Sequence, residues 1–458
     1  MRENPPGENM RSAYFFRRRI DALEQIPVDG ERIQVLLSAR DYREKALEVI
    51  RAAKKRIYIV ALYLQDDEGG RAILEALYAA KAENPEMDIK VFVDFHRAQR
   101  ALIGHGSHEG NVAMYRELRA KYPHPIDILG VPVKGKELFG VLHLKGSVFD
   151  DRLLYTGASF NDVYLHQGDR YRYDRYYVLD SAPVAGAMVD FIRGHFLDNP
   201  AVRALDVPDI ETVRELKRSI RRFKGKLRRA TYDYPGGKTG PGQVGISLLT
   251  GFGLRRNRLN RTIHDLMRSA SRRVVLLTPY FNPPATVIRD IRALVRRGVK
   301  VLLVTGDKTA NDFYIPPEEP FSKIGALPYL YENNLRRFVK RHRKMIAGGG
   351  LEVHLWHHGD NTFHLKGVFC DDTHQLITGS NLNPRAWRLD LENGLLIHDR
   401  EGVMRETVEK ELEMILGNTR KISSHEELED IPDYPDDVRI FLSRLRRAKA
   451  DILVKKLL

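Results

Sequence analysis

The order of apolar and polar residues repeats along the chain. Each half contains an apolar run typical of a buried strand, a stretch with apolar residues at helical spacing, and a second apolar run. These segments cover residues 55–63, 72–81 and 89–94 in the first half and 272–280, 285–297 and 299–304 in the second. A strand, a helix and a strand in this order form a β-α-β unit. The sequence therefore predicts an α/β fold of two duplicated lobes related by a pseudo-twofold axis.

A short polar motif follows the β-α-β unit in both halves. It reads His-x-Lys-(x)4-Asp, with His143, Lys145 and Asp150 in the first copy and His364, Lys366 and Asp371 in the second. The His and the Lys lie two residues apart, so they point to the same face of a strand. Each copy is followed by Gly-x-x-x-Asn, which ends at Asn161 or Asn383. A lone His-x-Lys is most often a satisfied structural pair, but its return with the same downstream element predicts one active site at the seam between the lobes.

These residue types suit displacement at a phosphodiester. A neutral imidazole is a nucleophile and a protonated one is an acid, so two histidines can attack phosphorus and protonate the leaving group. The paired lysines and asparagines would hold the non-bridging oxygens. This chemistry needs no metal, and we expect no cofactor. Asp150 and Asp371 complete the catalytic candidates, although they face away from the histidines along the strand and are better suited to orienting the structure.

Each histidine also needs an acceptor that fixes its second ring nitrogen. The carboxylates that follow the motifs at similar distances, Asp174 and Glu392, are the candidates. A further group, His354, His357 and His358, lacks the Cys or carboxylate spacing of a metal site, and we expect these histidines on the surface or lining a pocket.

With 458 residues the chain is long enough for two hydrophobic cores. We expect a first lobe over residues 1–205, a connector over 206–243, a second lobe over 244–417 and a helical tail over 418–458. The polar N-terminus is unlike a signal peptide and no apolar run approaches a membrane span, which predicts a cytoplasmic protein. The single cysteine, Cys370, falls on a predicted strand, where a buried thiol is expected.

The net charge of +14 predicts an anionic partner such as a nucleic acid, a nucleotide or an acidic lipid surface. Basic residues concentrate in the connector at 214–229 and in the tail at 438–458. The tail has apolar residues at helical spacing, which predicts a basic amphipathic helix lying on an anionic membrane. The residues expected to contact it are Phe441, Leu442, Leu445, Arg444, Arg446 and Arg447. The alternatives are a solvated helix face in the connector and a tail helix docked on the core.

The duplicated motif resembles that of the phospholipase D superfamily. Longer strings resemble the bacterial phosphatidylserine synthases of this superfamily over nearly the whole chain, at residues 59–64, 94–100, 157–166, 306–316 and 383–393. The resemblance implies transfer of a phosphatidyl group from CDP-diacylglycerol to L-serine, with release of CMP, by an enzyme that visits the inner face of the cell membrane.

The resemblance also implies roles for single residues. His143 would be the nucleophile and His364 the acid and base. The supporting carboxylates would cross the seam, which pairs Glu392 with His143 and Asp174 with His364.

Three residues are predicted to contact substrate. The loops 94–100 and 306–316 follow equivalent strands and should rise near the seam, where Arg97 and Lys308 would contact a pyrophosphate. The family pattern has a serine after the glycine of the downstream element. Ala158 replaces it in the first copy, so only the second lobe offers that hydroxyl, on Ser380.

Two other functions share parts of this pattern. A cardiolipin synthase or a phospholipase of the same superfamily would carry the same motif and differ in its acceptor pocket. A nuclease or nucleic-acid-binding protein would use the tyrosines and arginines at 170–177 as a stacking platform. The basic charge also suits non-specific binding to the ribosome or a nucleic acid. The sequence predicts no particular oligomeric state.

Overall fold

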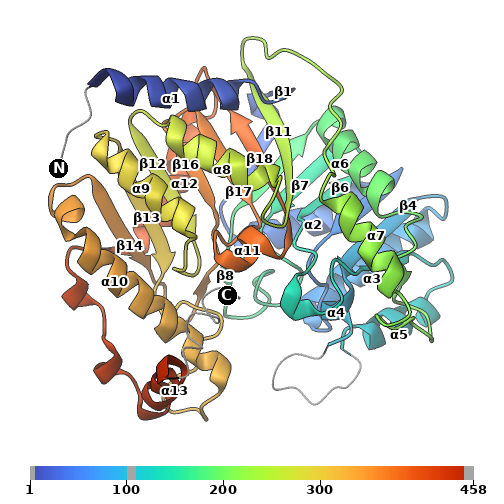
Figure 1. Cartoon of the computed structure of the whole chain (residues 1–458). Helices are drawn as coiled ribbons and strands as arrows, with labels where there is room; N and C mark the ends of the chain where they lie inside the picture. Colours follow the sequence, from blue (N-terminus) through green and yellow to red (C-terminus); the bar gives the residue numbers. More distant parts are fainter. Residues whose placement is uncertain (1–5, 101–109, 448–458) are drawn as a thin grey trace.

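The computed structural model describes residues 6–100 and 110–447 and contains two large sheets side by side (Figure 1). The first has the strand order β10-β5-β4-β3-β6-β7-β9-β2. Its strands are β10 (Arg203–Ala204), β5 (Asp127–Val131), β4 (Asp88–Asp94), β3 (Arg56–Val60), β6 (Gly146–Phe149), β7 (Arg152–Thr156), β9 (Tyr176–Asp180) and β2 (Ile33–Leu36).

The second sheet has the order β1-β11-β18-β17-β16-β12-β13-β14-β19. Its strands are β1 (Ile26–Asp29), β11 (Gln243–Phe252), β18 (Leu391–His398), β17 (His374–Thr378), β16 (Gly367–Cys370), β12 (Arg273–Thr278), β13 (Lys300–Gly306), β14 (Leu351–Trp356) and β19 (Thr419–Ile422). A two-stranded ladder of β8 (Arg172–Tyr173) and β15 (Thr362–Phe363) completes the pairing.

The two large sheets share one topology. In both, three neighbouring strands run parallel, β3-β4-β5 and β12-β13-β14. In both, the first of these strands then pairs antiparallel with the strand that follows the histidine motif, β6 or β16. The predicted β-α-β units correspond to β3-α3-β4 and β12-α9-β13, where α3 spans Glu68–Glu83 and α9 spans Ala285–Arg296. The predicted duplication and α/β class are confirmed.

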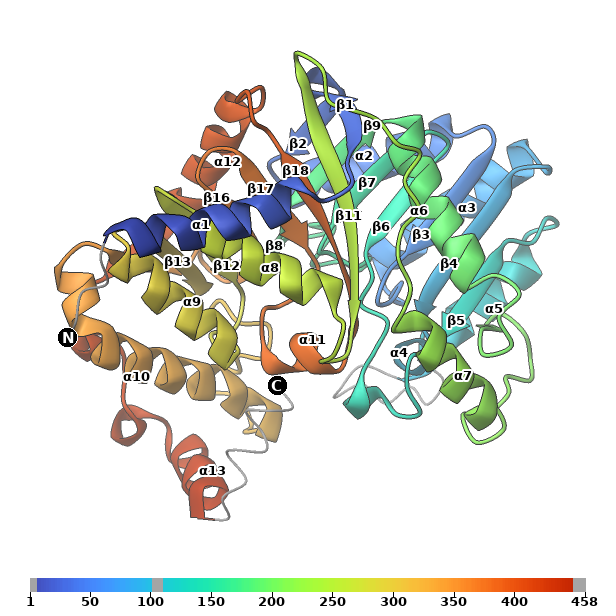
Figure 2. The ribbon, with the colours of Figure 1, turned by 45° about the horizontal axis from the view of Figure 1, so that its top comes forward.

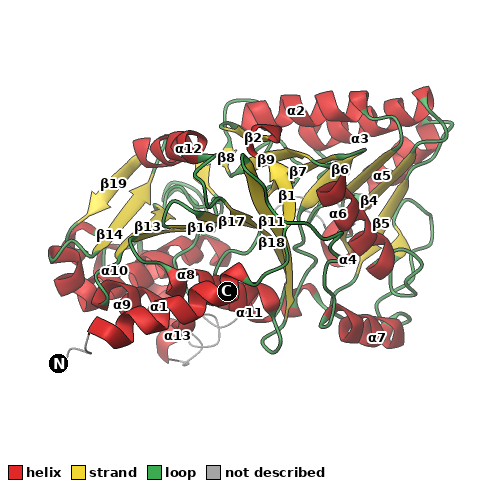
Figure 3. Cartoon of the chain, turned by 90° about the horizontal axis from the view of Figure 1, so that it is seen from above, coloured by secondary structure: helices red, strands yellow, loops and turns green. Residues whose placement is uncertain are grey.

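Helices cover both faces of the strands (Figure 3). In Figure 3, α2 (Ala39–Ala52) and α3 lie on one side, and α8 (Arg258–Ser269), α9 and α10 (Leu327–Ala347) lie on the other. The remaining helices are α1 (Pro6–Asp21), α4 (Phe95–Ala98), α5 (Val112–Lys121), α6 (Ala182–His195), α7 (Lys217–Leu227), α11 (Pro384–Arg388), α12 (Arg405–Gly417) and α13 (Asp436–Arg447). Short 3-10 turns are η1 (Gly30–Arg32), η2 (Glu137–Phe139), η3 (Lys323–Ala326), η4 (His425–Glu427) and η5 (Ile431–Asp433). Because both sheet faces are covered, β12 is apolar at every position from Val274 to Leu277.

The N-terminal segment crosses to the second lobe. The helix α1 lies along α8, as Figure 2 shows, and the strand β1 pairs antiparallel with β11. Ion pairs from Arg17 to Asp371 (3.2 Å) and from Arg19 to Asp265 (3.0 Å) hold α1 there. The segment 6–29, expected in the first lobe, therefore packs on the second, where β1 covers the otherwise open edge of β11.

The basic connector and the tail both dock on the protein. In the connector, α7 buries Ile220, Phe223 and Leu227. In the tail, α13 buries Val438 and Leu442 in a cluster formed with η3, α10 and η5, whose other buried members are Ala326, Tyr329, Leu330 and Tyr434.

The predicted membrane insertion of Phe441, Leu442 and Leu445 is therefore corrected. Leu442 is buried, and Phe441 and Leu445 pack against the same cluster, because the apolar side of α13 matches an apolar surface of its own protein. Arg444, Arg446 and Arg447 are exposed, whereas residues 448–458 of the predicted helix lie outside the described residues. Within the described ranges, no helix combines the length and the apolar character needed to cross a bilayer.

Candidate active site

Short backbone pairings across the seam hold the two histidines. The strands β15 and β8 pair in parallel, and a matching bridge joins Leu142 to Leu391. The backbone N–H of His143 donates to the carbonyl of Leu391 at 2.9 Å, and that of His364 donates to Tyr173 at 2.8 Å. The residue after each of these carbonyls is a carboxylate from the opposite lobe.

The carboxylates meet the histidines that the resemblance implies. Nδ1 of His143 lies 2.9 Å from Glu392, and Nδ1 of His364 lies 2.8 Å from Asp174. All four side chains are buried. With Nδ1 of His143 occupied, Nε2 is the ring nitrogen that remains for chemistry in the cleft.

The two lysines lie beside the histidines, but their partners differ. Nζ of Lys366 donates to Asp174 at 2.9 Å and also contacts Nδ1 of His364. Nζ of Lys145 donates to Oγ of Ser159 at 3.0 Å. The active site is therefore duplicated in position and asymmetric in its contacts.

Asn393 fixes the backbone of Lys145 from the other side of the seam. Its Oδ1 accepts from the Lys145 N–H at 2.9 Å, and its Nδ2 donates to the Lys145 carbonyl at 2.8 Å. The hydroxyls of Tyr155 and Tyr232 satisfy the rest of this buried amide. Sequence reasoning missed Asn393, although it directly follows Glu392.

The glycines of the downstream elements are required by close approach. A Cβ at Gly157 would lie 2.8 Å from the Asp174 carboxylate and 2.9 Å from Nζ of Lys366. A Cβ at Gly379 would lie 2.9 Å from Cγ of Lys145 and 3.1 Å from the carbonyl of His143. Each glycine thus leaves the space that the catalytic candidates occupy.

Burial dominates the electrostatics of the site. It lowers the pKa of His143 well below its ordinary value, with Lys145 adding to the effect, and it lowers the pKa of His364 to about 3 together with Lys366. Both imidazoles are therefore neutral in the free protein at neutral pH. Burial and the neighbouring Lys366 also lower the pKa of Lys145 to about 7.

The two carboxylates respond differently to burial. Burial raises the pKa of Glu392 to about 8. For Asp174 burial is outweighed by Lys366 and His364, which lower its pKa to about 2. The His364 side therefore carries a firmly ionised carboxylate, whereas Glu392 on the His143 side is only partly ionised at neutral pH.

A cleft of about 570 Å³ opens above both histidines. Its lining combines residues of both lobes: Tyr63, Arg97, Arg100, Asn161, Tyr164 and Arg172 from the first, and Tyr280, Asp312, Tyr331, Asn383 and Arg385 from the second. The predicted residues Lys145, Asn161, Asn383 and Arg97 all reach this cleft. The cleft is large enough to hold a small ligand.

Asp150 and Asp371, named among the catalytic candidates, make the structural contacts that their place on the strand favoured. They occupy equivalent tight turns with φ of 53° and 50°. Asp150 accepts hydrogen bonds from the backbone amides of residues 54–56, and Asp371 accepts them from residues 271–273. These bonds outweigh burial and lower the pKa of both carboxyls. Each Asp ties the start of a central strand to the turn after the motif.

The hydroxyl predicted from Ser380 is placed differently. Ser380 is fully buried and lies outside the cleft lining, whereas Ser159 lines the cleft and binds Lys145. The first lobe therefore supplies a hydroxyl from the position after Ala158, which a strict reading of the motif overlooks.

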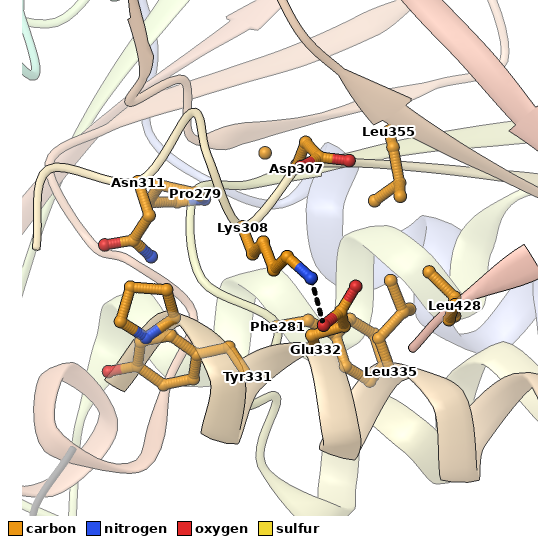
Figure 4. A pocket seen from close by; sticks show the side chains of 12 residues that line it. Pro279, Phe281, Asp307, Lys308, Asn311, Tyr331, Glu332, Leu335, Leu355 and Leu428 are labelled. Carbon is orange, nitrogen blue, oxygen red and sulfur yellow. Dashed lines mark hydrogen bonds and ion pairs between the residues drawn. The ribbon is translucent and has the colours of Figure 1, made fainter. Parts of the chain in front are cut away.

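Lys308 is also corrected. Its Nζ lies 3.2 Å from Glu332 on α10 and 2.5 Å from Glu429, and it lies over the rings of Tyr329 and Tyr434. Figure 4 shows it pointing at Glu332 within a separate cavity of about 20 Å³, which has room for little more than one water. Its charge is neutralised there, so it is no pyrophosphate contact.

The histidine cluster of the second lobe divides among separate partners. His354 lies 2.9 Å from the Thr419 hydroxyl, and His358 lies 2.8 Å from the Tyr171 hydroxyl. Cys370 is buried, and burial raises the pKa of its thiol to about 12.

Comparison with known proteins places these features in a context. A family model described as the cardiolipin synthase, phospholipase D-like domain matches residues 263–416. The CDP-diacylglycerol–serine O-phosphatidyltransferase of Haemophilus influenzae is 46% identical over 445 residues, which covers 96% of this chain and 98% of the relative. The enzyme of that name from Escherichia coli is 45% identical over 443 residues, with the same coverage of 96% and 98%.

A solved structure agrees closely. The crystal structure of phosphatidylserine synthase from Haemophilus influenzae matches with a TM-score of 0.94 and 45% identity, over 97% of this chain and 100% of the other. Cardiolipin synthase B of Salmonella typhi is a more distant relative, 23% identical over 86% of this chain and 82% of the relative.

Proposed function

Because the chain belongs to the CDP-diacylglycerol–serine O-phosphatidyltransferases of the phospholipase D superfamily, we propose that His143 and His364 carry its reaction by two displacements at one phosphorus. The protein transfers a phosphatidyl group from CDP-diacylglycerol to L-serine and releases CMP. The observation that carries the mechanism is the pair of His–carboxylate contacts across the seam of a single cleft.

In the first displacement His143 is the nucleophile. Its Nε2 attacks the phosphatidyl phosphorus and forms a P–N bond, while the P–O bond to CMP breaks and the electron pair leaves with the CMP oxygen. The anionic substrate favours the protonated form of His364, so in the complex this imidazolium donates the proton that the oxygen takes up and becomes neutral for the next step. Glu392 stabilises the charge that develops on His143, because it lies 2.9 Å from Nδ1.

In the second displacement His364 is the general base. It takes the proton of the serine hydroxyl, whose oxygen attacks the phosphorus as the bond to His143 breaks. Asp174, which stays ionised, supports the imidazolium that forms. An alkoxide is a far stronger base than departing CMP, so His364 matters more in this step than in the first.

The lysines and asparagines hold the phosphate oxygens. Lys145, Asn161 and Asn383 line the cleft, where their donors meet the charge that develops at phosphorus, and the buried Lys366 adds its positive charge from beside Asp174. Arg97, which lies 5.1 Å from the centre of the Tyr63 ring, is the candidate contact for the pyrophosphate.

An adduct-trapping experiment tests these roles. The His143→Ala protein should release no CMP, whereas His364→Ala should release CMP once and retain an acid-labile phosphatidyl group, detected with acyl-labelled CDP-diacylglycerol. His354→Ala is the matched control, because His354 contacts Thr419 outside the cleft. Turnover by the His143→Ala protein contradicts the mechanism.

We also propose that the protein docks on the anionic inner face of the cell membrane with the mouth of this cleft. The substrate carries two acyl chains and stays in the bilayer. Leu138 and Phe139 are 53% and 49% exposed beside the cleft residue Glu137, and Phe321 is 39% exposed on the loop before the cleft residue Ile324. Large exposed apolar side chains around a polar mouth suit insertion into the interface.

The basic surface supports the same docking. Lys136 lies exposed on this rim, and α13 presents Arg444, Arg446 and Arg447 to solvent while its apolar side stays docked. Attraction of these cations to anionic lipid would weaken as salt rises. The same charge would support non-specific binding to a polyanion such as the ribosome or a nucleic acid.

Vesicle co-sedimentation tests the rim. Replacing Leu138 and Phe139 by Ser should lower binding to anionic vesicles, and activity on bilayer substrate should fall more than activity on detergent-dispersed substrate. Met414→Ser is the control, because Met414 is 44% exposed on α12, away from the cleft lining. Equal sedimentation of the rim and control variants refutes this docking face.

A further inference from the structure

An Arg–Asp pair that the mechanism above does not use lies in the cleft beside His364. Nη1 of Arg172 on β8 lies 3.4 Å from Oδ2 of Asp312, on the loop after β13, and each side chain is 14% exposed. Both line the cleft together with Tyr164, whose hydroxyl lies 3.0 Å from Nδ1 of His364. The pair therefore stands where an acceptor activated by His364 must enter.

Arg172 and Asp312 each make further contacts that hold their side chains in place. Nε of Arg172 donates to the hydroxyl of Thr362 at 3.2 Å, and its guanidinium lies 4.8 Å from the centre of the Tyr164 ring. Oδ1 of Asp312 accepts a hydrogen bond from the Tyr280 hydroxyl. The separation of 3.4 Å between the two charged groups exceeds the roughly 2.7–2.9 Å of a close charge-assisted hydrogen bond. The two charges are held in place but only weakly joined to each other.

Both groups are ionised at neutral pH. Burial opposes the charge of Arg172, but Asp312 and the surrounding tyrosines outweigh it and hold its pKa well above the ordinary value. Burial likewise opposes the charge of Asp312, but Arg172 and His364 outweigh it and lower its pKa. The His364 end of the cleft thus presents one positive and one negative charge. In the remaining lining Arg100 pairs with Glu137 at 3.1 Å and Arg385 with Asp390 at 3.2 Å, closer pairs than that of Arg172 and Asp312.

We propose that Arg172 and Asp312 form the acceptor subsite and select L-serine through both of its α-charges. The guanidinium binds the carboxylate, the Asp312 carboxylate binds the ammonium, and the hydroxymethyl group points to His364. This assignment rests on the proposed role of His364 as the base. Because both charges of serine are carried on one carbon, a single Arg–Asp pair contacts them together. An uncharged alcohol leaves the pair unmatched, and a phosphate-bearing acceptor is repelled by Asp312.

The test compares three primary alcohols in the full-length protein. Ethanolamine lacks the carboxylate of serine, and glycerate lacks the ammonium. Arg172→Met should lower the ratio of kcat/KM for serine to that for ethanolamine by about tenfold or more, as expected for one lost charge-assisted contact. Asp312→Asn should lower the serine-to-glycerate ratio by a similar factor and preserve the serine-to-ethanolamine ratio, because both of these acceptors keep the ammonium.

If the Arg172–Asp312 ion pair only holds the two lobes together, the result is different. Loss of such a pair lowers all three acceptors equally and preserves every ratio, and this outcome overturns the proposal. Arg170→Met is the matched control, because Arg170 is an exposed arginine of the same segment that donates to the Asp360 carbonyl. Its ratios should equal those of the wild type. If Arg172→Met fails to fold, Arg172→Lys takes its place, because it keeps the charge but loses the paired N–H donors of the guanidinium. Its serine KM should rise, and an unchanged serine KM overturns the proposal.

Failure of the subsite is separable from failure of the proposed mechanism. Exchange of labelled CMP into CDP-diacylglycerol without serine reports the first displacement alone. Each serine rate is therefore divided by the exchange rate of the same variant. Absence of wild-type exchange contradicts the His143 adduct, whereas normal exchange with unchanged acceptor ratios contradicts only the Arg172–Asp312 assignment.

Discussion

Substitution of Glu411 by Ala tests whether a buried ion pair holds the seam behind the active site. Arg175 belongs to the first lobe and is 2% exposed, whereas Glu411 lies on α12 of the second. The Arg175 guanidinium donates to both oxygens of Glu411, at 2.7 and 2.9 Å, and to the hydroxyl of Tyr177 at 2.7 Å. Removal of Glu411 leaves this charge buried among neutral partners, which costs about 3–5 kcal/mol of folding free energy.

The expected loss of folding free energy in Glu411→Ala can be converted to a shift in the melting temperature. An unfolding entropy of about 2.1 cal/mol/K per residue gives about 1 kcal/mol/K for the 458 residues. A loss of about 4 kcal/mol then lowers Tm by about 4 °C if the chain unfolds as one unit. The shift is about 8 °C if one lobe, roughly half of the chain, unfolds alone. Scanning calorimetry at a fixed scan rate measures the shift and separates the transitions.

Two controls isolate the buried charge. Glu75→Ala breaks an exposed pair with Lys121, whose side chains are 44% and 57% exposed, and should cost under about 1 kcal/mol. A double variant with Met at 175 and Leu at 411 carries no unpaired charge, so it should be more stable than Glu411→Ala. The backbone N–H of Arg175 also donates to Asp174 at 2.9 Å, so Glu411→Ala should slow serine transfer as well. A Tm within about 1 °C of the exposed control refutes this reasoning.

Three further predictions follow from the site. The pKa of Lys145, lowered to about 7, means that its charge is lost as pH rises through that value. The kcat/KM for detergent-dispersed CDP-diacylglycerol should therefore fall as pH rises above about 7. This fall should move to higher pH in Lys145→Arg, and an unchanged pH profile contradicts the assignment. Gly379→Ala should reduce activity at least tenfold by displacing Lys145, whereas Gly186→Ala on α6, where a Cβ meets no neighbour, should stabilise the protein by about 0.5–1 kcal/mol. Lys308→Met should lower Tm and leave the KM for CDP-diacylglycerol unchanged, because Lys308 neutralises Glu332; a raised KM would restore it as a substrate contact.

The duplicated lobes and the catalytic residues could be predicted because their signals are local. Apolar runs identify β3 and β12, and the spacing of His143 and Lys145 places both on one strand face. The cross-seam pairing of Glu392 was available only from the family resemblance, since no periodicity links residues so far apart in the chain.

The corrections for α13 and Lys308 share one physical cause. An amphipathic pattern indicates that one face of a helix is buried but does not indicate what buries it. The tail was therefore predicted to lie on a membrane, whereas α13 docks on α10 and η3. A single charge in a loop is equally ambiguous: Lys308 and Arg97 follow equivalent strands, but Lys308 pairs with Glu332 and Glu429, whereas Arg97 lines the cleft. The sequence singled out the stretches 170–177 and 306–316 but did not pair Arg172 with Asp312, because that contact joins two lobes.

Because the segment 6–29 packs on the second lobe, it constrains the order in which the parts of the chain can fold. Ser247 bonds to the carbonyl of Glu24, 223 residues earlier, and Arg17 reaches Asp371, 354 residues later. During synthesis, α1 and β1 leave the ribosome before β11 and α8 and can dock only when these have been made, whereas the strands of the first sheet, β2 to β7, β9 and β10, are made earlier than β11. The elements α1 and β1 are thus made before the first sheet but can dock only after it. The segment that α1 and β1 form therefore stays without its partners until the second lobe has been synthesised.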